Sequence, residues 1–247
     1  MSAIAIESLT KSFSTQLTKK KQILHAVSLR ADQGKVTGFI GLNGAGKSTL
    51  INLVMGFTFP DSGTISIFGQ DPTLPVTRKK TGYLPEHTRF QEHLTGFQLL
   101  RYAGAVADLS SQTTRKRGSE LLEKLALANA GNNQVRSYSK GMKQRLGLAL
   151  ALLPDPELYI LDEPMSGLDP LGRQMVKDII IEEKKRGKSI FFSSHILNDI
   201  ETLCDNIEII QQGKIIYSGP VTNFCDTTGD MESKFIQLHT NPEGPQA

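Results

Sequence analysis

Four short segments in the first third of the chain have the residue pattern of β-strands. Apolar and polar residues alternate in three of them, and the last is a short apolar run. Turn signals flank two of these segments. DQG at residues 32–34 follows the second segment, and PDSG at residues 60–63 precedes the third. The segments are residues 3–9, 23–29, 64–68 and 81–84. We expect these pieces to form a small antiparallel sheet beside a main one, with the N-terminal segment as an edge strand.

The region from about residue 86 to residue 153 has a helical pattern throughout. Thr95 can cap a helix that carries Phe97 and Leu100, and a leucine stripe at residues 120–127 predicts a second helix. Stripes of this kind indicate burial in a core rather than a binding function. We therefore expect an all-helical insertion here.

Strands and helices alternate in the second half of the chain. The predicted strands are residues 158–161, 189–193, 206–210 and 214–217, and the predicted helices are residues 171–185 and 198–204. The last two strands are expected to form a hairpin around Gln212 and Gly213. Strands that are separated by helices predict a parallel sheet covered on both faces. The predicted fold class is therefore α/β, with a mostly parallel sheet, a small antiparallel β subdomain and an inserted all-helical subdomain.

A phosphate-binding loop is the clearest chemical signal in the sequence. Residues 41–49 read GLNGAGKST, between a predicted strand at 35–40 and helical spacing at 50–54. In such loops, backbone N–H groups and the helix N-terminus attract phosphates, the lysine bridges the β- and γ-phosphates, and the hydroxyl ligates Mg²⁺. The flanking strand and helix disfavour a chance glycine turn. The residues expected at a nucleoside triphosphate are Gly41, Asn43, Gly44, Ala45, Gly46, Lys47, Ser48 and Thr49.

Two adjacent carboxylates follow the predicted strand at residues 158–161. Asp162 and Glu163 would lie at the C-terminal edge of the parallel sheet, where ligands bind in such folds. Asp162 is expected to hold Mg²⁺ directly or through water, and Glu163 to act as the general base for an attacking water. Taken without the strand, the pair is equally compatible with a surface turn.

Two further residues are ambiguous when each is considered alone. Ser139 caps a predicted helix with Gly141 in its first turn, which is compatible with a phosphate site or with a plain helix cap. His195 follows a serine pair at a strand end, and a lone histidine is more often structural.

The order of these motifs resembles that of ATP-binding cassette (ABC) proteins. The chain has a Walker A loop at 41–49, a signature-like segment at 139–143 and a Walker B strand at 158–163. A D-loop-like SGLD at 166–169 and the switch-like His195 follow. The resemblance covers about residues 3 to 220 and implies the P-loop NTPase fold of that family.

The resemblance also implies how the residues would be used. Cassettes pair head to tail, so Ser139 and Gly141 would contact the nucleotide that the partner subunit holds. Asp169 would help to seat the opposing subunit, and His195 would contact the γ-phosphate and position the attacking water. The catalytic residues would be Glu163, His195 and Lys47.

The chain departs from the family pattern at three positions. Phe13 stands where a tyrosine usually stacks on adenine, and it would either stack there without a hydroxyl or pack in the edge sheet. Glu86 stands where a glutamine usually ligates Mg²⁺, and its carboxylate can still bind the metal. Lys140 replaces a common glycine, which requires a negative φ. The strings GYLPE and MESKFIQLH resemble bacterial export ATPases that work with separate membrane chains.

Composition narrows the partners and the compartment. The formal net charge is +3, and the basic residues are dispersed, so no nucleic-acid partner is expected. The basic run at residues 19–21 is predicted to be a solvated hairpin loop rather than a contact for a phosphate or a lipid. The two cysteines suggest neither a disulfide framework nor a zinc site, and the longest apolar run, at 146–153, is too short to span a bilayer.

These observations predict the ATPase subunit of an ABC export system. The expected cofactors are ATP and Mg²⁺, and the expected partners are a second copy of the subunit and separate transmembrane permease subunits. We expect a cytoplasmic protein, peripheral on the cell membrane, with a cassette at residues 1–220 and a short extension at 221–247. The alternatives are a soluble cassette acting on ribosomes or DNA, and a nucleotide-gated interaction module without turnover.

Overall fold

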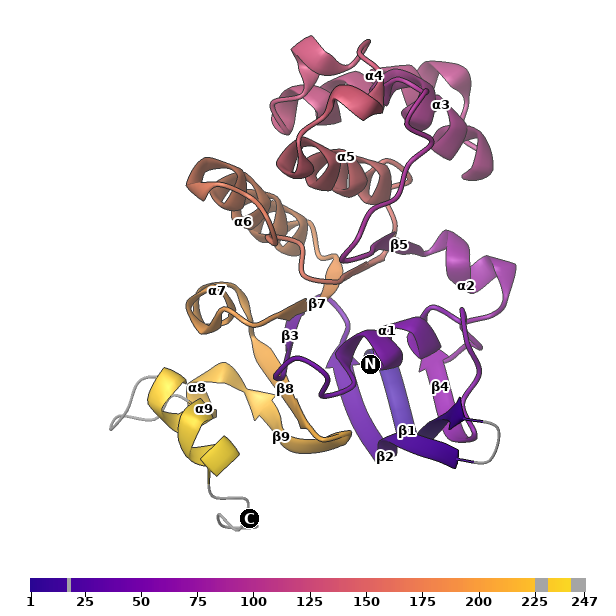
Figure 1. Ribbon diagram of the computed structural model, residues 1–247. Coiled ribbons are helices and arrows are strands. Elements are labelled where there is room, and N and C mark those ends of the chain that lie inside the picture. The colour runs from indigo at the N-terminus through magenta and orange to yellow at the C-terminus, as the bar shows by residue number, and fades with distance from the viewer. Residues whose placement is uncertain (17–18, 225–230, 241–247) are drawn as a thin grey trace.

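The computed structural model describes residues 1–16, 19–224 and 231–240 and contains two β-sheets with helices packed against them (Figure 1). The larger sheet has six strands, and all but the last run parallel. In spatial order they are β5 (Thr81–Leu84), β6 (Leu158–Leu161), β7 (Ser189–Ser194), β3 (Val36–Ile40), β8 (Asn206–Gln211) and β9 (Lys214–Pro220). The predicted mostly parallel sheet is confirmed.

Both faces of the larger sheet are buried. Consecutive residues of a strand point to opposite faces, and Phe39 and Ile40 of β3 are both fully buried. Phe39 belongs to an apolar cluster that includes residues of both sheets and of α1 (Lys47–Val54). Ile40 belongs to the cluster on the other face, which includes residues of several helices. Among them are α5 (Lys140–Leu152), α6 (Pro170–Lys185) and α7 (Leu197–Leu203).

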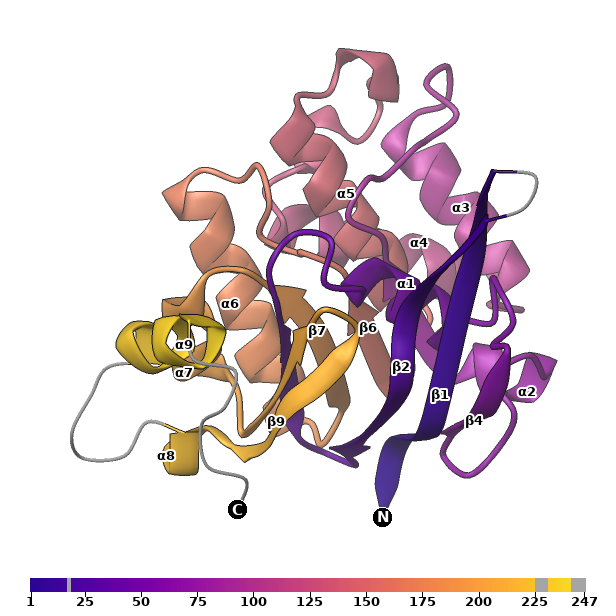
Figure 2. The same ribbon diagram turned by 60° about the horizontal axis from the view of Figure 1, so that its bottom comes forward.

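The smaller sheet is antiparallel, with the strand order β2-β1-β4, and Figure 2 shows its three strands side by side. Its strands are β1 (Ser2–Gln16), β2 (Lys19–Asp32) and β4 (Ser62–Ile67). The expectation of an N-terminal edge strand is wrong, because β1 pairs on both sides. The segment at 81–84 was expected in this sheet, but β5 pairs in parallel with β6 in the larger one. A four-residue apolar segment does not encode which neighbour it joins.

The predicted loop at residues 19–21 is also wrong in its local structure. Lys20 and Lys21 lie in β2 and pair with Ser14 and Phe13 of β1, although both lysines are exposed as expected. The strands of this hairpin are therefore longer than the alternating pattern indicated.

The helical region forms one end of the molecule, where Figure 1 shows α3, α4 and α5 together. Thr95 caps α3 (Gly96–Val106) as predicted, since its hydroxyl accepts a hydrogen bond from the Gln98 N–H at 3.2 Å. Leu122 of α4 (Ser111–Lys124) is fully buried. Two 3₁₀ turns, Ala128–Ala130 and Val135–Ser137, lead to α5.

The C-terminal segment packs on the core. Val221 and Phe224 of α8 (Val221–Phe224) and Met231 of α9 (Met231–Thr240) are buried in the cluster that contains α7. Residues 225–230 and 241–247 of the predicted extension lie outside the described residues. The remaining helix, α2 (Pro75–Lys79), precedes β5.

Candidate nucleotide site

The phosphate-binding loop connects the end of β3 to the start of α1. Gly44 and Gly46 have φ values of 80° and 113°, in the left-handed region that favours glycine. A Cβ atom at Gly41 would lie 2.5 Å from the carbonyl oxygen of Ile210, so this position also excludes larger residues. The glycines thus allow the backbone conformation that leads into the helix N-terminus.

A cleft of about 510 Å³ opens at this loop. It combines the loop and the first turn of α1 with three acidic residues from two other segments. Of the residues that were predicted to bind the nucleotide or Mg²⁺ or to catalyse the reaction, those that line the cleft are Asn43, Gly44, Gly46, Lys47, Ser48, Thr49, Glu86, Asp162 and Glu163. Gly41 and Ala45 belong to the loop but do not line the cleft. The Ala45 carbonyl instead accepts a hydrogen bond from the Gly213 N–H at 3.0 Å.

Lys47 is the first residue of α1, and its side chain folds back over the loop. The ammonium donates to the Gly41 carbonyl oxygen at 2.5 Å and to the Leu42 carbonyl oxygen at 3.4 Å. Its position in the cleft lets it reach an anion held at the helix N-terminus, where backbone N–H groups lack partners within the helix.

The two carboxylates leave the sheet at the edge shared with the loop. Strand β7 lies between β6 and β3, and the parallel order brings the C-terminal ends of all three together. The Ser193 hydroxyl in β7 accepts a hydrogen bond from the Glu163 N–H at 2.8 Å and donates one to Asp162 Oδ1 at 2.6 Å. One hydroxyl therefore fixes both acidic residues.

The Asp162 carboxyl has a pKa above its ordinary value. Burial is the main cause, and the charge of Glu86 adds to it, while hydrogen bonds from Ser193 and Ser48 oppose it. A nearby cation would stabilise the charged form of this carboxylate. Oxygen donors from one or two carboxylates, a hydroxyl and substrate phosphates suit Mg²⁺, so Asp162, Ser48 and Glu86 fit this ion. Among the residues that the structure describes, no group of three or more His, Cys, Asp or Glu residues could hold a metal without such phosphates.

Glu163 adopts a backbone conformation that is unusual for its residue type. Its φ of 49° lies in the left-handed region, which costs a non-glycine residue about 1 kcal/mol. The hydrogen bond to Ser193 holds this conformation, and Gln144 Nε2 donates to the Glu163 carbonyl oxygen at 3.3 Å. The side chain turns toward His195, with Nδ1 of the imidazole 2.8 Å from Oε2 of the carboxylate.

Ser193 and Gln144 were not singled out in the sequence analysis. Ser193 belongs to the serine pair that precedes His195, and Gln144 lies in the signature-like helix, so both were close to recognised motifs. Their contacts connect segments that are 19 to 31 residues apart in the chain. Local sequence patterns contain no signal for such contacts.

The signature-like and D-loop-like segments meet on a different part of the surface. A Cβ atom at Gly141 would lie 3.5 Å from the Gly167 carbonyl oxygen, so the two segments are adjacent. Ser139 caps α5 by accepting from the Met142 N–H at 3.2 Å, and Asp169 caps α6 by accepting from the Gly172 N–H at 2.8 Å. Neither of these two residues lines the cleft at the phosphate-binding loop.

Phe13 and Lys140 are the remaining departures from the family pattern. Phe13 lies in β1 with 43% of its surface exposed, and Lys11 Nζ is 5.3 Å from the centroid of its ring. It does not line the cleft. Lys140 begins α5 and is not among the residues with positive φ, as its position requires.

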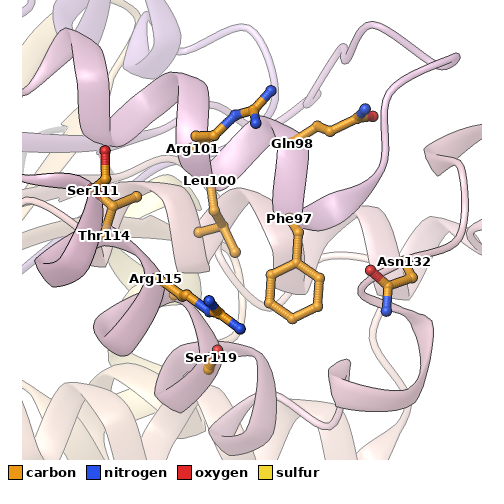
Figure 3. Close-up of a pocket in the computed structure, with 10 residues that line it drawn as sticks. Phe97, Gln98, Leu100, Arg101, Ser111, Thr114, Arg115, Ser119 and Asn132 are labelled. Carbon is orange, nitrogen blue, oxygen red and sulfur yellow. The ribbon is translucent and has the colours of Figure 1, made fainter.

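A second hollow of about 500 Å³ lies between α3 and α4 (Figure 3). The Phe97 ring points into it from α3, and Arg115 and Ser119 lie on α4. No residue predicted to bind nucleotide lines it. The hollow is therefore separate from the nucleotide cleft.

Comparison with known proteins identifies the family. The family model described as ABC transporter matches residues 24–166, which include the phosphate-binding loop and both carboxylates. The chain belongs to the ABC transporter family. A solved structure of the ATP-binding subunit of an ABC transporter has a TM-score of 0.87 and 31% identity, and the match covers 96% of this chain and 99% of that one. The predicted P-loop NTPase fold with its small antiparallel sheet is confirmed.

Curated relatives agree with this assignment. An uncharacterized ABC transporter ATP-binding protein from Nostoc sp. is 44% identical over 205 residues, which are 82% of this chain and 61% of that protein. The chain thus spans about three fifths of this relative. A lantibiotic transport ATP-binding protein from Streptococcus pyogenes is 38% identical, over 86% of this chain and 89% of its own length. A dimeric ATP-binding cassette solved with ADP and Pi shares the fold, at 21% identity and a TM-score of 0.82.

Among the described residues, none of the helices combines the length and the apolar character needed to cross a bilayer.

Proposed function

We propose that this chain is the ATP-hydrolysing subunit of an ABC export system. The observation that carries the proposal is the position of Glu163 in the cleft, with its backbone held by Ser193 and its carboxylate 2.8 Å from His195. A plain phosphate-binding protein would not need a carboxylate in this cleft with an imidazole hydrogen-bonded to it.

ATP binds with its phosphates at the N-terminus of α1. The loop N–H groups and the helix dipole attract the phosphate oxygens, and the Lys47 ammonium takes the β- and γ-phosphates. Asp162, Ser48 and Glu86 would hold Mg²⁺, which would supply positive charge to offset the negative charge of the phosphates.

Glu163 accepts the proton of the attacking water as general base. A carboxylate only accepts hydrogen bonds, so the imidazole proton lies on Nδ1 of His195 where it faces Oε2. In the neutral ring, Nε2 then carries a lone pair and can accept a hydrogen bond from the attacking water, whereas a contact with a γ-phosphate oxygen requires a proton on Nε2 as well. His195 thus orients the base and the reacting group together.

The composite site is completed by a second copy of the chain. Ser139 and Gly141 lie on a helix N-terminus outside the chain's own cleft, so they are available to the γ-phosphate of a nucleotide on the partner. The dimeric cassette with the same fold is a precedent for such pairing. ATP closes the dimer and hydrolysis reopens it, which converts chemistry into motion.

Export is supported by the relatives, and docking on membrane subunits is supported by an apolar surface. Matching proteins include a linearmycin resistance and a daunorubicin resistance ATP-binding protein. Large apolar side chains are exposed around α2 and α3, and an ion pair between Lys79 and Asp108 at 2.6 Å joins these regions. The exposed residues are Phe57, Phe59, Val76, Tyr102 and Val106. We infer that separate permease subunits dock there and beside the loop of Glu86, keeping the protein at the cytoplasmic face of the membrane.

Substitution of Glu163 by glutamine tests the proposal, because an amide cannot accept the proton. Glu163→Gln should keep ATP binding and lower phosphate release by a factor of about a hundred or more. Light scattering should show the mass of the variant doubling with ATP, since the closed dimer no longer reopens. Phosphate release at the wild-type rate would exclude Glu163 as the base. An absence of ATP-dependent release in the folded wild type would favour a nucleotide-gated module instead.

A further inference from the structure

The basic run at residues 19–21 reaches the nucleotide cleft. Lys21 and Ile23 of β2 line the cleft together with the phosphate-binding loop. The pairing of β1 and β2 shifts register at Ile23, since Lys11 pairs with Leu24 and Ser12 with Gln22, so Lys21 is placed at the cleft by its lining position and not by strand alternation. Lys20, between Lys21 and the hairpin turn, leaves the opposite face and does not line the cleft.

Packing of β2 against the loop fixes where Lys21 lies. A Cβ atom at Gly46 would lie 2.9 Å from the Leu24 side chain and 3.6 Å from the Ile23 carbonyl oxygen. Strand β2 therefore passes the start of α1, where the phosphates bind. Going back along the chain from this contact, β2 leads to the hairpin turn. In that direction, Lys21 is the next residue after Ile23 that lines the cleft.

Lys21 also faces the aromatic residue of the hairpin. Phe13 is its direct partner in the antiparallel pair of β1 and β2, so both side chains lie on one face. Phe13 lies outside the cleft and Lys21 within its lining, so the lysine stands on the path from the aromatic ring to the phosphate loop. An aromatic ring at this end offers a stacking surface for a nucleobase.

The positive charge of Lys21 is available to an anion that binds in the cleft. Lys21 is exposed, and no ion pair links it to an acidic side chain in the part of the chain that the structure describes. The Lys47 ammonium, in contrast, is hydrogen-bonded to the loop. An anionic group that enters beside Lys21 would thus gain a charge-assisted contact.

We propose that Lys21 binds the α-phosphate of the nucleotide. The inference rests on the proposed nucleotide site. Lys47 serves the β- and γ-phosphates and Phe13 the base, and the α-phosphate lies between these groups in the covalent structure of ATP. Lys21 therefore contributes to the affinity for nucleoside diphosphates and triphosphates alike.

Isothermal titration of the full chain with ATP and with ADP, both with Mg²⁺, tests this assignment. Lys21→Met keeps most of the aliphatic side chain and removes the charge. It should raise Kd for both nucleotides by the same factor, about three- to tenfold, as expected for one partly exposed ion pair. Lys20→Met is the matched control, because it removes the same charge from the opposite face. Lys21→Arg should retain the wild-type affinity.

The outcomes separate this inference from the proposed function. Equal Kd values for Lys21→Met and Lys20→Met would overturn the role of Lys21, and so would a loss that affects ATP but not ADP. In both cases the wild type would still bind nucleotide, so the proposed site would stand. If the folded wild type bound neither nucleotide, the proposed function itself would be wrong.

Discussion

At the scale of single residues, Ser193 organises the acidic edge of the site. Its hydroxyl contacts both Asp162 and the backbone of Glu163, at 2.6 and 2.8 Å. The bond to Asp162 stabilises the charged carboxylate, which burial disfavours. Its loss should therefore affect the metal ligand and the base together.

Ser193→Ala should lower the rate of phosphate release about tenfold, as expected for a lost hydrogen bond to a charged group. It should also change the pH dependence. The pKa of Asp162 is already raised, and removing this bond raises it further. The ionised carboxylate is the form that holds Mg²⁺. On acidification, the variant should therefore lose activity at a higher pH than the wild type does. Phosphate release measured across the acidic limb tests this shift.

Ser189→Ala provides the matched control on the same strand. The Ser189 hydroxyl accepts a hydrogen bond from the Gly34 N–H at 2.9 Å, at the end of β7 away from the carboxylates. This variant should keep the wild-type acidic limb. An unchanged limb in Ser193→Ala would contradict the assigned role of its hydroxyl.

The residues of the site were predictable to different degrees. Those of the phosphate-binding loop are contiguous, so their spacing alone identified them. The pairing of Glu163 with His195 depends on which strands are neighbours, and only the family resemblance suggested that both act on one phosphate. The contacts of Ser193 and Gln144 became visible only in the folded chain.

At the scale of elements, periodicity predicted most strands and helices but not their pairing. The pattern at residues 81–84 is that of a strand, yet nothing in four residues distinguishes a parallel neighbour from an antiparallel one. The hairpin of β8 and β9 was predicted correctly, because its turn residues Gln212 and Gly213 both adopt the positive φ that such turns need. Turn chemistry is local, whereas sheet order is not.

Glu208 of β8 is a buried carboxyl between strands and should make stability depend on pH. Its side chain accepts from the Ser218 hydroxyl of β9 at 2.8 Å and from the backbone of Arg30 in β2. Its Oε2 atom has no hydrogen-bond partner in the described parts of the chain. Burial raises the pKa of this carboxyl from 4.5 to about 7, so the folded chain favours the protonated form.

The sign of the effect follows from proton binding. Between pH 4.5 and about 7 the folded state keeps a proton that the unfolded state has released. The contribution of Glu208 is therefore fully present below pH 4.5 and is lost as the pH rises through about 7. Across this window it should amount to about 1–3 kcal/mol.

Glu208→Gln should remove this contribution, because an amide does not titrate. Urea unfolding at several pH values should show a smaller loss of stability between pH 5 and about pH 7 in the variant than in the wild type. The exposed Glu201 of α7 is the control, and Glu201→Gln should follow the wild-type curve. Parallel curves for Glu208→Gln and the wild type would show that the carboxyl does not hold its proton in the folded state.

At the scale of the whole molecule, the site is divided between two surfaces. The cleft contains Lys47 and the carboxylates, whereas Ser139 lies outside it on the N-terminus of α5. Within one copy, the residues that line the cleft bring Lys47 but not Ser139 to the nucleotide, and a composite site would bring both there. Head-to-tail pairing of two copies would do so twice, once for each cleft.

Mixed dimers test this pairing. Lys47→Ala should abolish ATP binding in its own cleft, and Ser139→Arg should block the cleft of the partner, so each variant alone should be inactive. In a dimer of one subunit of each kind, one composite site has both residues intact. An equal mixture should recover up to about a quarter of the wild-type phosphate release, because half of the dimers are mixed and each has one intact site.

Lys47→Ala mixed with the double variant Lys47→Ala/Ser139→Arg is the control, since no dimer there has an intact site. If mixed dimers form but remain as inactive as this control, the head-to-tail arrangement is wrong, or both sites must be intact for turnover. Two tandem fusions separate these outcomes. A wild-type subunit fused to a Lys47→Ala/Ser139→Arg subunit has both sites damaged if the pairing is head to tail. A wild-type subunit fused to a Lys47→Ala subunit has a single intact site, so its activity shows whether one site is enough for turnover.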